Sequence, residues 1–129
     1  MLTSPCPCGS GVREDACCGR LHRGEARALT AAELMRSRYT AFVRHDAGYL
    51  LATWHPRTRP HDLRLDLDPA VVWTGLDVLA THAGGPDDAT GVVEFVAHHE
   101  GGRLHERSRF ERRAGRWVYV DGDVVDDAR

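Results

Sequence analysis

The chain contains no lysine, asparagine, glutamine or isoleucine, so all seventeen of its basic residues are arginine. We interpret this bias as the mutational signature of a GC-rich genome, and arginine content alone is therefore no evidence for nucleic-acid binding. No apolar run approaches the roughly eighteen residues that span a membrane. The start, MLTSPCPC, has neither the basic region nor the apolar core of a signal peptide. The sequence predicts a cytoplasmic protein without membrane contact.

Charge of both signs is present, but it is distributed unevenly. Residues 1–64 carry ten arginines against six acids, whereas residues 65–129 carry seven arginines against thirteen acids, for a net charge of −2. Two interpretations are open: a basic partner-binding surface in the first half, or two solvated faces that partly pair with each other. The overall acidity argues against nucleic acid as a partner. At 129 residues the chain has the length of one domain.

Cysteine is absent after residue 18, and the four cysteines of the chain are Cys6, Cys8, Cys17 and Cys18. In a reducing compartment such a cluster indicates metal binding rather than disulfides. No C-x-x-C pair is present, which argues against redox chemistry. Four thiolates complete the tetrahedral shell of a structural zinc ion and leave no open catalytic position. The sequence therefore predicts one structural Zn²⁺ on these four side chains.

A second ligand set is open because His22 follows the cluster closely. Adjacent Cys17 and Cys18 must diverge to reach one metal, so three cysteines and His22, in place of Cys18, are the alternative shell. The prolines and glycines of PCPCGSG suit a tight knuckle. Because residues 1–19 contain few large apolar side chains, we expect the metal to supply most of the folding energy of this arm.

The stretch CPCGSG, followed by a cysteine pair that eight residues separate from Cys8, resembles the SEC-C zinc motif at the C-terminus of the SecA preprotein translocase. The likeness continues through CCGRLHRGEARALTAAELMRSRYTAFVRHDAGYLLATWHPRTRP, GVVEFVAHH and LHERSRFERRAGRWVYVDGD, where the chain resembles the YchJ-like family of uncharacterised bacterial proteins. This resemblance implies a SEC-C-like zinc-binding motif at residues 1–25 and a nuclear transport factor 2-like domain at residues 26–129. It implies protein partners or ribosomes for the motif, and no established activity.

Polarity patterns after the arm predict helices followed by strands. Thr30 and Glu33 in LTAAEL form a capping box at the start of a helix. The apolar stripe of that helix comprises Leu34, Met35, Arg38, Tyr39 and Phe42. A second short helix begins at Asp46 and ends before Pro56.

From residue 61 the polarity pattern takes the two-residue period of strands. The alternating or β-branched stretches are DLRLDLD, VVWTGLDVLATH, GVVEFVAHHE, RLHERSRFERR and RWVYVDGDVV, separated by glycine-containing turns. The sequence therefore predicts an α+β fold in which four or five antiparallel strands form a curved sheet over the long helix. This order agrees with the cone-shaped fold that the resemblance implies.

Charged and polar residues occur at positions where the pattern predicts a core. Arg38 falls on the apolar helix stripe, and Glu106 and Ser108 fall on the inward face of their strand. In one interpretation Arg38 and Glu106 form a buried ion pair that fixes the helix on the sheet. In the other they line a pocket, where Glu106 acts as a general base and Arg38 holds an anion. His55, beside Trp54, is either a further pocket residue or a hydrogen-bonded corner residue.

Three functions follow from these features. The first is a non-catalytic adaptor that docks protein partners through the zinc knuckle, in a secretion- or ribosome-related role, helped by Arg13, Arg20, Arg23 and Arg27. The second is a small-molecule binder or enzyme that uses the pocket, although the sequence shows no recognisable nucleophile–base pair. The third, zinc storage, fits a closed four-cysteine shell poorly. The sequence favours the adaptor.

Overall fold

The computed structural model describes residues 4–61 and 68–125. A short 3₁₀ turn η1 (Glu14–Ala16) and three helices, α1 (Cys18–His22), α2 (Ala31–Arg44) and α3 (Ala47–Ala52), precede four strands. The strands are β1 (Trp73–Ala83), β2 (Thr90–His99), β3 (Gly102–Arg113) and β4 (Arg116–Val124). The predicted order of knuckle, helices and strands is confirmed, whereas nearly all of the strand expected at residues 62–68 lies outside the described residues.

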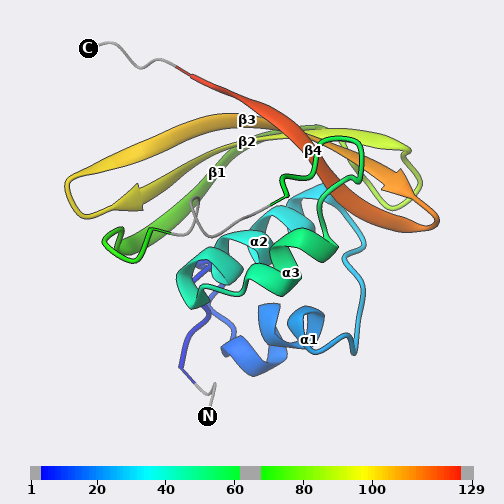
Figure 1. Ribbon diagram of the computed structural model, residues 1–129. Helices are drawn as coiled ribbons and strands as arrows, with labels where there is room; N and C mark the ends of the chain where they lie inside the picture. Colours follow the sequence, from blue (N-terminus) through cyan, green and yellow to red (C-terminus); the bar gives the residue numbers. More distant parts are fainter. Residues whose placement is uncertain (1–3, 62–67, 126–129) are drawn as a thin grey trace.

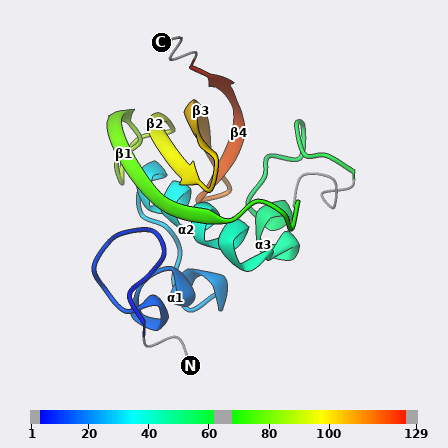
Figure 2. The ribbon, with the colours of Figure 1, turned by 90° about the vertical axis from the view of Figure 1, so that its left-hand side faces the viewer.

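The fold has three layers, which Figure 1 shows with the sheet uppermost, α2 and α3 in the middle and the N-terminal arm with α1 below. The four strands form one antiparallel sheet in the order β1-β2-β3-β4, so every connection is a hairpin. Register shifts interrupt β1 twice and the β3–β4 pair once. Such irregularities bend strands, and Figure 2 shows the sheet curving over α2.

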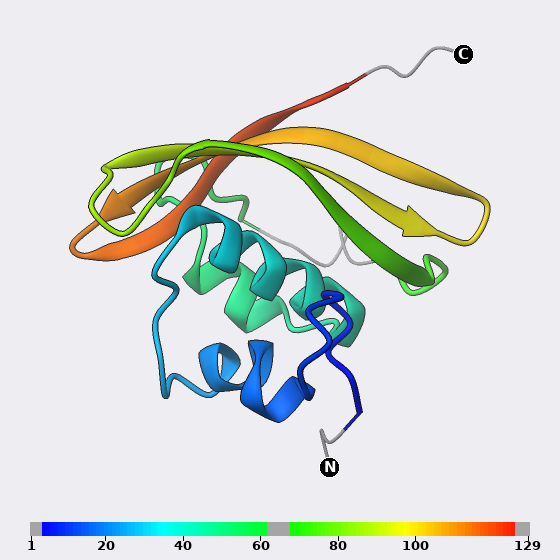
Figure 3. The ribbon, with the colours of Figure 1, turned by 180° about the vertical axis from the view of Figure 1, so that it is seen from behind.

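Helix α2 is the central element, because one of its sides faces the sheet and the other faces the arm (Figure 3). The hydroxyl of Thr30 accepts a hydrogen bond from the Glu33 amide at 3.0 Å, as the capping box predicts. The Glu33 carboxylate reaches back to the amide of Leu29 at 2.8 Å rather than to that of Thr30. The helix ends at Arg44, and the next residue, His45, caps it in a left-handed conformation.

The Thr30 cap makes a prediction about stability. We expect Thr30→Ala to lower the free energy of unfolding by about 1 kcal/mol, because the Glu33 amide then loses its acceptor. Thr30→Ser keeps the hydroxyl and should lose much less. Urea unfolding monitored by circular dichroism measures both variants; equal losses for the two would contradict a role for the hydroxyl.

The main core lies between α2 and the concave face of the sheet, and it continues into the arm. Cys6, Cys8 and Cys18 belong to the same buried cluster as Leu34 of α2 and Phe110 of β3. The arm therefore packs on the domain through the cysteines themselves. In the described ranges, no helix combines the length and the apolar character that a membrane span requires.

Candidate metal centre and ligand cavity

The four cysteines converge on one point of the arm. Their sulfur atoms all lie within 4.8 Å of one another, and every one of the side chains except the half-buried Cys17 is buried. The Sγ atoms of Cys8 and Cys17 are 3.7 Å apart. Four sulfurs at the Zn–S distance of about 2.3 Å stand about 3.8 Å apart in a tetrahedron. The donor set and its spacing thus fit a metal ion of this kind.

Local backbone structure brings the sulfurs together. The first pair lies in a knuckle closed by hydrogen bonds from the Gly9 amide to Cys6 O at 3.1 Å and from the Cys6 amide to Val12 O at 2.8 Å. Gly9 has a φ of 84°, a left-handed conformation that favours glycine. Cys17 lies between η1 and α1, and Cys18 is the first residue of α1, so the adjacent side chains diverge and still reach one centre.

The four thiols shift one another's pKa values, because they are close together and mostly buried. The pKa of Cys6 is lowered because Cys18 and then Cys8 donate hydrogen bonds to its sulfur. The pKa of Cys18 is raised, mainly by its hydrogen bond to Cys6, and burial raises the pKa of Cys17. Several buried thiolates cannot coexist without a compensating cation, and a divalent ion provides that compensation.

Side chains of α2 contact the cysteine knuckle and fix its position. The guanidinium of Arg36 donates to the carbonyl of Cys8 at 2.7 Å, and Thr40 Oγ1 lies 3.6 Å from the sulfur of Cys6. Glu14, whose side chain is 1% exposed, accepts two hydrogen bonds from Arg44 at the end of α2. Sequence reasoning missed this pair, because the contact spans thirty residues and no local pattern indicates it.

His22 does not join the cluster. Its Nε2 donates to the carbonyl of Ser37 at 2.9 Å, and its ring packs against Tyr49 with centroids 4.4 Å apart. The alternative ligand set with His22 in place of Cys18 is therefore not the one that the structure assembles.

The arginines expected to form a basic docking head mostly pair within the chain. Each of three arginines has an acidic partner. The pairs are Arg13 with Asp15 at 3.2 Å, Arg20 with Glu33 at 2.6 Å and Arg23 with Glu25 at 3.0 Å. These pairs neutralise much of the positive charge near the knuckle.

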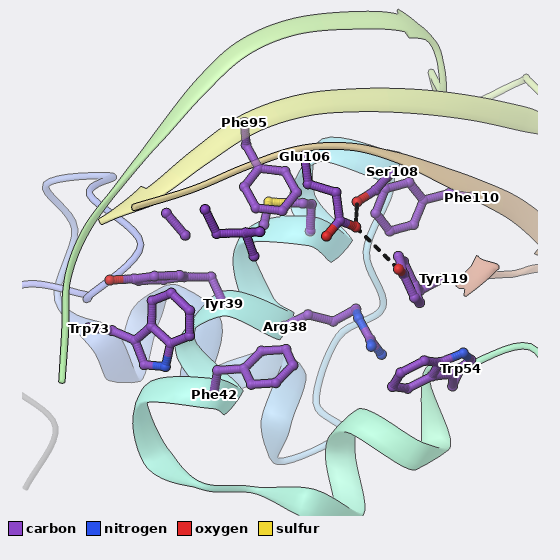
Figure 4. Close-up of a pocket in the computed structure, with 13 residues that line it drawn as sticks. Arg38, Tyr39, Phe42, Trp54, Trp73, Phe95, Glu106, Ser108, Phe110 and Tyr119 are labelled. Carbon is purple, nitrogen blue, oxygen red and sulfur yellow. Dashed lines mark hydrogen bonds between the residues drawn. The ribbon is translucent and has the colours of Figure 1, made fainter. Parts of the chain in front are cut away.

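A cavity of about 350 Å³ lies on the other side of α2, beneath the sheet (Figure 4). Most of its wall is aromatic or aliphatic. The lining residues are Met35, Arg38, Tyr39, Phe42, Trp54, Trp73, Phe95, Ala97, Leu104, Glu106, Ser108, Phe110 and Tyr119. Both charged side chains predicted to face a pocket, Arg38 and Glu106, are among them, as is Ser108.

Arg38 is 5% exposed, and among the described residues no carboxylate pairs with its guanidinium. Nη1 donates to Leu50 O at 2.9 Å and to Thr53 Oγ1 at 2.7 Å. The guanidinium carbon also lies 4.9 Å from the ring centroid of Trp54 and 4.7 Å from that of Tyr119, at cation–π distance. Burial lowers the pKa of Arg38 to about 10, so the group stays cationic at neutral pH.

The two rings that contact Arg38 are brought together by backbone hydrogen bonds. These bonds join β4 to the segment that follows α3. The amide of His55 donates to Tyr119 O, and the amide of Tyr119 donates to Thr53 O, each at 2.8 Å. The rings of Trp54 and Tyr119 consequently lie edge to face with centroids 5.1 Å apart. Sequence reasoning did not find Tyr119 or Thr53 as site residues, because this pairing joins segments more than sixty residues apart.

Glu106 lies on the opposite wall. Its Oε2 accepts hydrogen bonds from Ser108 Oγ at 2.7 Å and from the Tyr119 hydroxyl at 3.2 Å. Burial and the neighbouring carboxylate raise the pKa of Tyr119, so the phenol remains a donor. Gly122 leaves room for the carboxylate, since a Cβ there would lie 2.2 Å from Oε2.

The structure decides between the two interpretations that the sequence left open for Arg38 with Glu106 and for His55. The ion pairs of the described residues do not include one between Arg38 and Glu106. Each instead takes neutral partners, and Tyr119 contacts both, through its ring with Arg38 and through its hydroxyl with Glu106. His55 does not line the cavity. It is buried at the corner that follows α3, where Nδ1 accepts the Arg57 amide at 3.0 Å and Nε2 lies 3.4 Å from Glu111, as the corner interpretation predicts.

Comparison with known proteins shows the family of the chain. Residues 30–122 match the family model described as the middle NTF2-like domain of YchJ. A UPF0225 protein of Streptomyces coelicolor is 60% identical over 126 residues, covering 98% of this chain and all of that protein. A UPF0225 protein of Cupriavidus pinatubonensis is 50% identical over 135 residues, covering 97% of this chain and 92% of the relative.

Two solved structures are also similar. A SEC-C motif containing protein from Rhodopseudomonas palustris has a TM-score of 0.83 and 35% identity, over 95% of this chain and all of that one. A SEC-C motif containing protein from Psychrobacter arcticus has a TM-score of 0.79 and 27% identity, over all of this chain and 88% of the other. With its four-cysteine cluster ahead of an α+β domain, the chain belongs to the YchJ family of UPF0225 proteins.

Proposed function

We propose that this protein binds a small molecule in the cavity beneath its sheet, and that one structural Zn²⁺ on Cys6, Cys8, Cys17 and Cys18 holds its N-terminal arm in place. One observation carries the proposal: a buried guanidinium and a carboxylate line the same cavity without pairing with each other.

The unpaired charges are the main physical argument. Burying an ion without a counter-ion costs several kcal/mol, and replacing a buried pair by apolar residues is often neutral or stabilising. A cavity kept open between Arg38 and Glu106 therefore serves something other than stability. Its volume of about 350 Å³ and its apolar wall with a few polar groups are typical of small-molecule sites.

The side chains that line the cavity suit ligand binding better than catalysis. Among the described lining residues the ionisable groups are Arg38, Glu106, Tyr39 and Tyr119, with no histidine or cysteine. The Glu106 carboxylate already accepts two hydrogen bonds through one oxygen. The enzyme interpretation, with Glu106 as general base, remains the alternative use of the same cavity.

The zinc assignment is supported by the donor set. Four thiol sulfurs at this spacing match the closed tetrahedral shell of structural zinc sites. When bound, the divalent cation compensates the negative charges of four neighbouring, mostly buried thiolates. The chain itself contributes the knuckle, the α1 helix start and the bond from Arg36 that orient the sulfurs.

Filling the cavity tests the proposal. We expect acetophenone, used as an apolar aromatic probe, to shift amide and indole resonances around the cavity in ¹H–¹⁵N spectra of the zinc-loaded chain. Leu104→Trp places an indole in the cavity and should abolish those shifts. Leu79→Trp, at a position 52% exposed on β1, is the matched control and should keep them. Binding that survives in Leu104→Trp would refute the cavity as the site.

Docking of a protein partner or a ribosome through the knuckle is the second candidate function. The observation in its favour is the exposed knuckle tip, where Val12 is 46% exposed beside Ser10 and Gly11. The paired arginines nearby weaken the electrostatic part of this idea. Comparing the proteins captured from lysate by the native chain and by Val12→Asp tests it, and identical sets would count against the knuckle tip.

A further inference from the structure

We infer that the cavity selects a neutral, planar aromatic compound carrying both a hydrogen-bond donor and an acceptor, such as an aromatic amide or a nitrogen heterocycle. The donor meets Glu106 and the acceptor meets Arg38. This inference rests on the proposed function of the cavity and adds the chemical class of its ligand.

Charge balance argues for a neutral ligand. Arg38 and Glu106 are the only oppositely charged side chains among the described lining residues, and they bring one positive and one negative charge to the same space. A ligand carboxylate would pair with Arg38 but be repelled by Glu106, and a ligand cation would meet the reverse problem. A neutral compound avoids both repulsions and the desolvation cost of burying another ion.

Unused hydrogen-bonding capacity argues for a ligand with both a donor and an acceptor. Ser108 and Tyr119 both donate to Oε2 of Glu106, and Figure 4 shows the other carboxylate oxygen turned toward the open space. On Arg38, Nη1 makes both described hydrogen bonds, while Nε and Nη2 have no acceptor among the described residues. A ligand N–H can satisfy the first group, and a ligand oxygen or ring nitrogen the second.

The walls argue for an aromatic ring. At one end Trp73 lies edge-on to Tyr39, with ring centroids 6.1 Å apart, and 6.3 Å from Phe42. At the other end Tyr119 lies 5.8 Å from Phe110. Rings around a cavity favour a flat guest that meets them in stacked or edge-to-face geometry. Because Trp54 and Tyr119 already enclose the Arg38 cation, they offer no free cage for a cationic guest.

Four compounds of nearly equal shape test the inference: benzamide, benzoate, benzamidinium and acetophenone. They differ in charge and in hydrogen-bonding groups, and their dissociation constants are measured by ¹H–¹⁵N titration of the zinc-loaded full chain. We expect benzamide to bind about tenfold more tightly than benzoate or benzamidinium, and more tightly than acetophenone, which lacks the donor.

A charge-altering variant makes the test sharper. Glu106→Gln removes the negative charge but keeps an acceptor for Ser108 and Tyr119, so the fold is preserved. The cavity then carries a net positive charge, and we expect benzoate to gain about tenfold relative to benzamide while benzamidinium loses affinity further. Gly122→Ala leaves the charges of the cavity unchanged, but its Cβ displaces the Glu106 carboxylate. We therefore expect this variant to bind benzamide more weakly than the wild type.

The possible outcomes separate this inference from the proposed function. If wild-type protein binds none of the four compounds, both fail. If benzoate, benzamidinium or acetophenone binds as tightly as benzamide, the cavity is a binding site but the ligand class is wrong. If Glu106→Gln leaves the order of affinities unchanged, the carboxylate does not choose the ligand and the inference is overturned.

Discussion

Cys8→Ser should release the bound zinc and unfold the N-terminal arm while leaving the sheet folded. Cys8 is fully buried, its sulfur is 3.7 Å from that of Cys17, and its carbonyl accepts the Arg36 guanidinium. Structural zinc contributes about 10–16 kcal/mol of apparent binding energy in small zinc-finger peptides at pH 7. The cysteine side chains are also where the arm packs on the domain, so loss of the metal disturbs the core as well, and we expect the melting temperature of the whole protein to fall by about 10 °C or more.

Two measurements check this expectation. Elemental analysis should give one zinc per native chain and none for Cys8→Ser. Hydrogen exchange should show loss of protection in residues 4–22 with β2 and β3 still protected. Ser10→Ala is the control, because Ser10 lies 3.1 Å from the Cys17 sulfur without belonging to the cluster, and it should retain the metal. Full zinc content in Cys8→Ser would remove Cys8 from the ligand set.

Arg44→Met should lower the free energy of unfolding by about 2–3 kcal/mol, which is the second largest effect that we expect. The substitution leaves the carboxylate of Glu14 buried without its cation, and breaking a buried pair costs about 3–5 kcal/mol. We set the value lower because the Arg44 side chain is 46% exposed and partly screened by solvent. Urea unfolding of the zinc-loaded protein measures the loss.

A double variant and a surface variant control this result. Glu14→Leu with Arg44→Met removes both charges, and replacing a buried pair by apolar groups should restore most of the stability. Arg23→Met removes the exposed pair with Glu25 and a hydrogen bond to the Asp15 carbonyl, and it should lower the free energy of unfolding much less than Arg44→Met. If Arg44→Met is no more harmful than Arg23→Met, the buried pair does not anchor the arm.

Elements governed by local interactions could be predicted from the sequence. The Thr30 cap and the apolar stripe locate α2, because both depend on residues within two turns of one another. The two-residue period places Ser108 and Phe110 on the inward face of β3, and both are buried. The cysteine cluster was also predictable, since its four members lie within thirteen residues and a metal shell requires them to meet.

Contacts between distant segments were not predictable in this way. The sequence placed Arg38 and Glu106 on facing surfaces but could not show that each binds neutral groups and leaves a cavity between them. The two interpretations of His55, a pocket residue or a hydrogen-bonded corner residue, could likewise be separated only by the tertiary structure, in which the His55 amide pairs with Tyr119 and the residue lies at the corner.

The sequence by itself determined the order of the elements, the faces of helix and strand, and the four sulfurs available to a metal, because periodicity and spacing act along the chain. Only the tertiary structure decided the choice of Cys18 over His22, the Glu14–Arg44 anchor and the open space beneath the sheet. Those features depend on the curvature of the sheet and on how α2 is placed between the sheet and the arm, and these arise from packing across the whole domain.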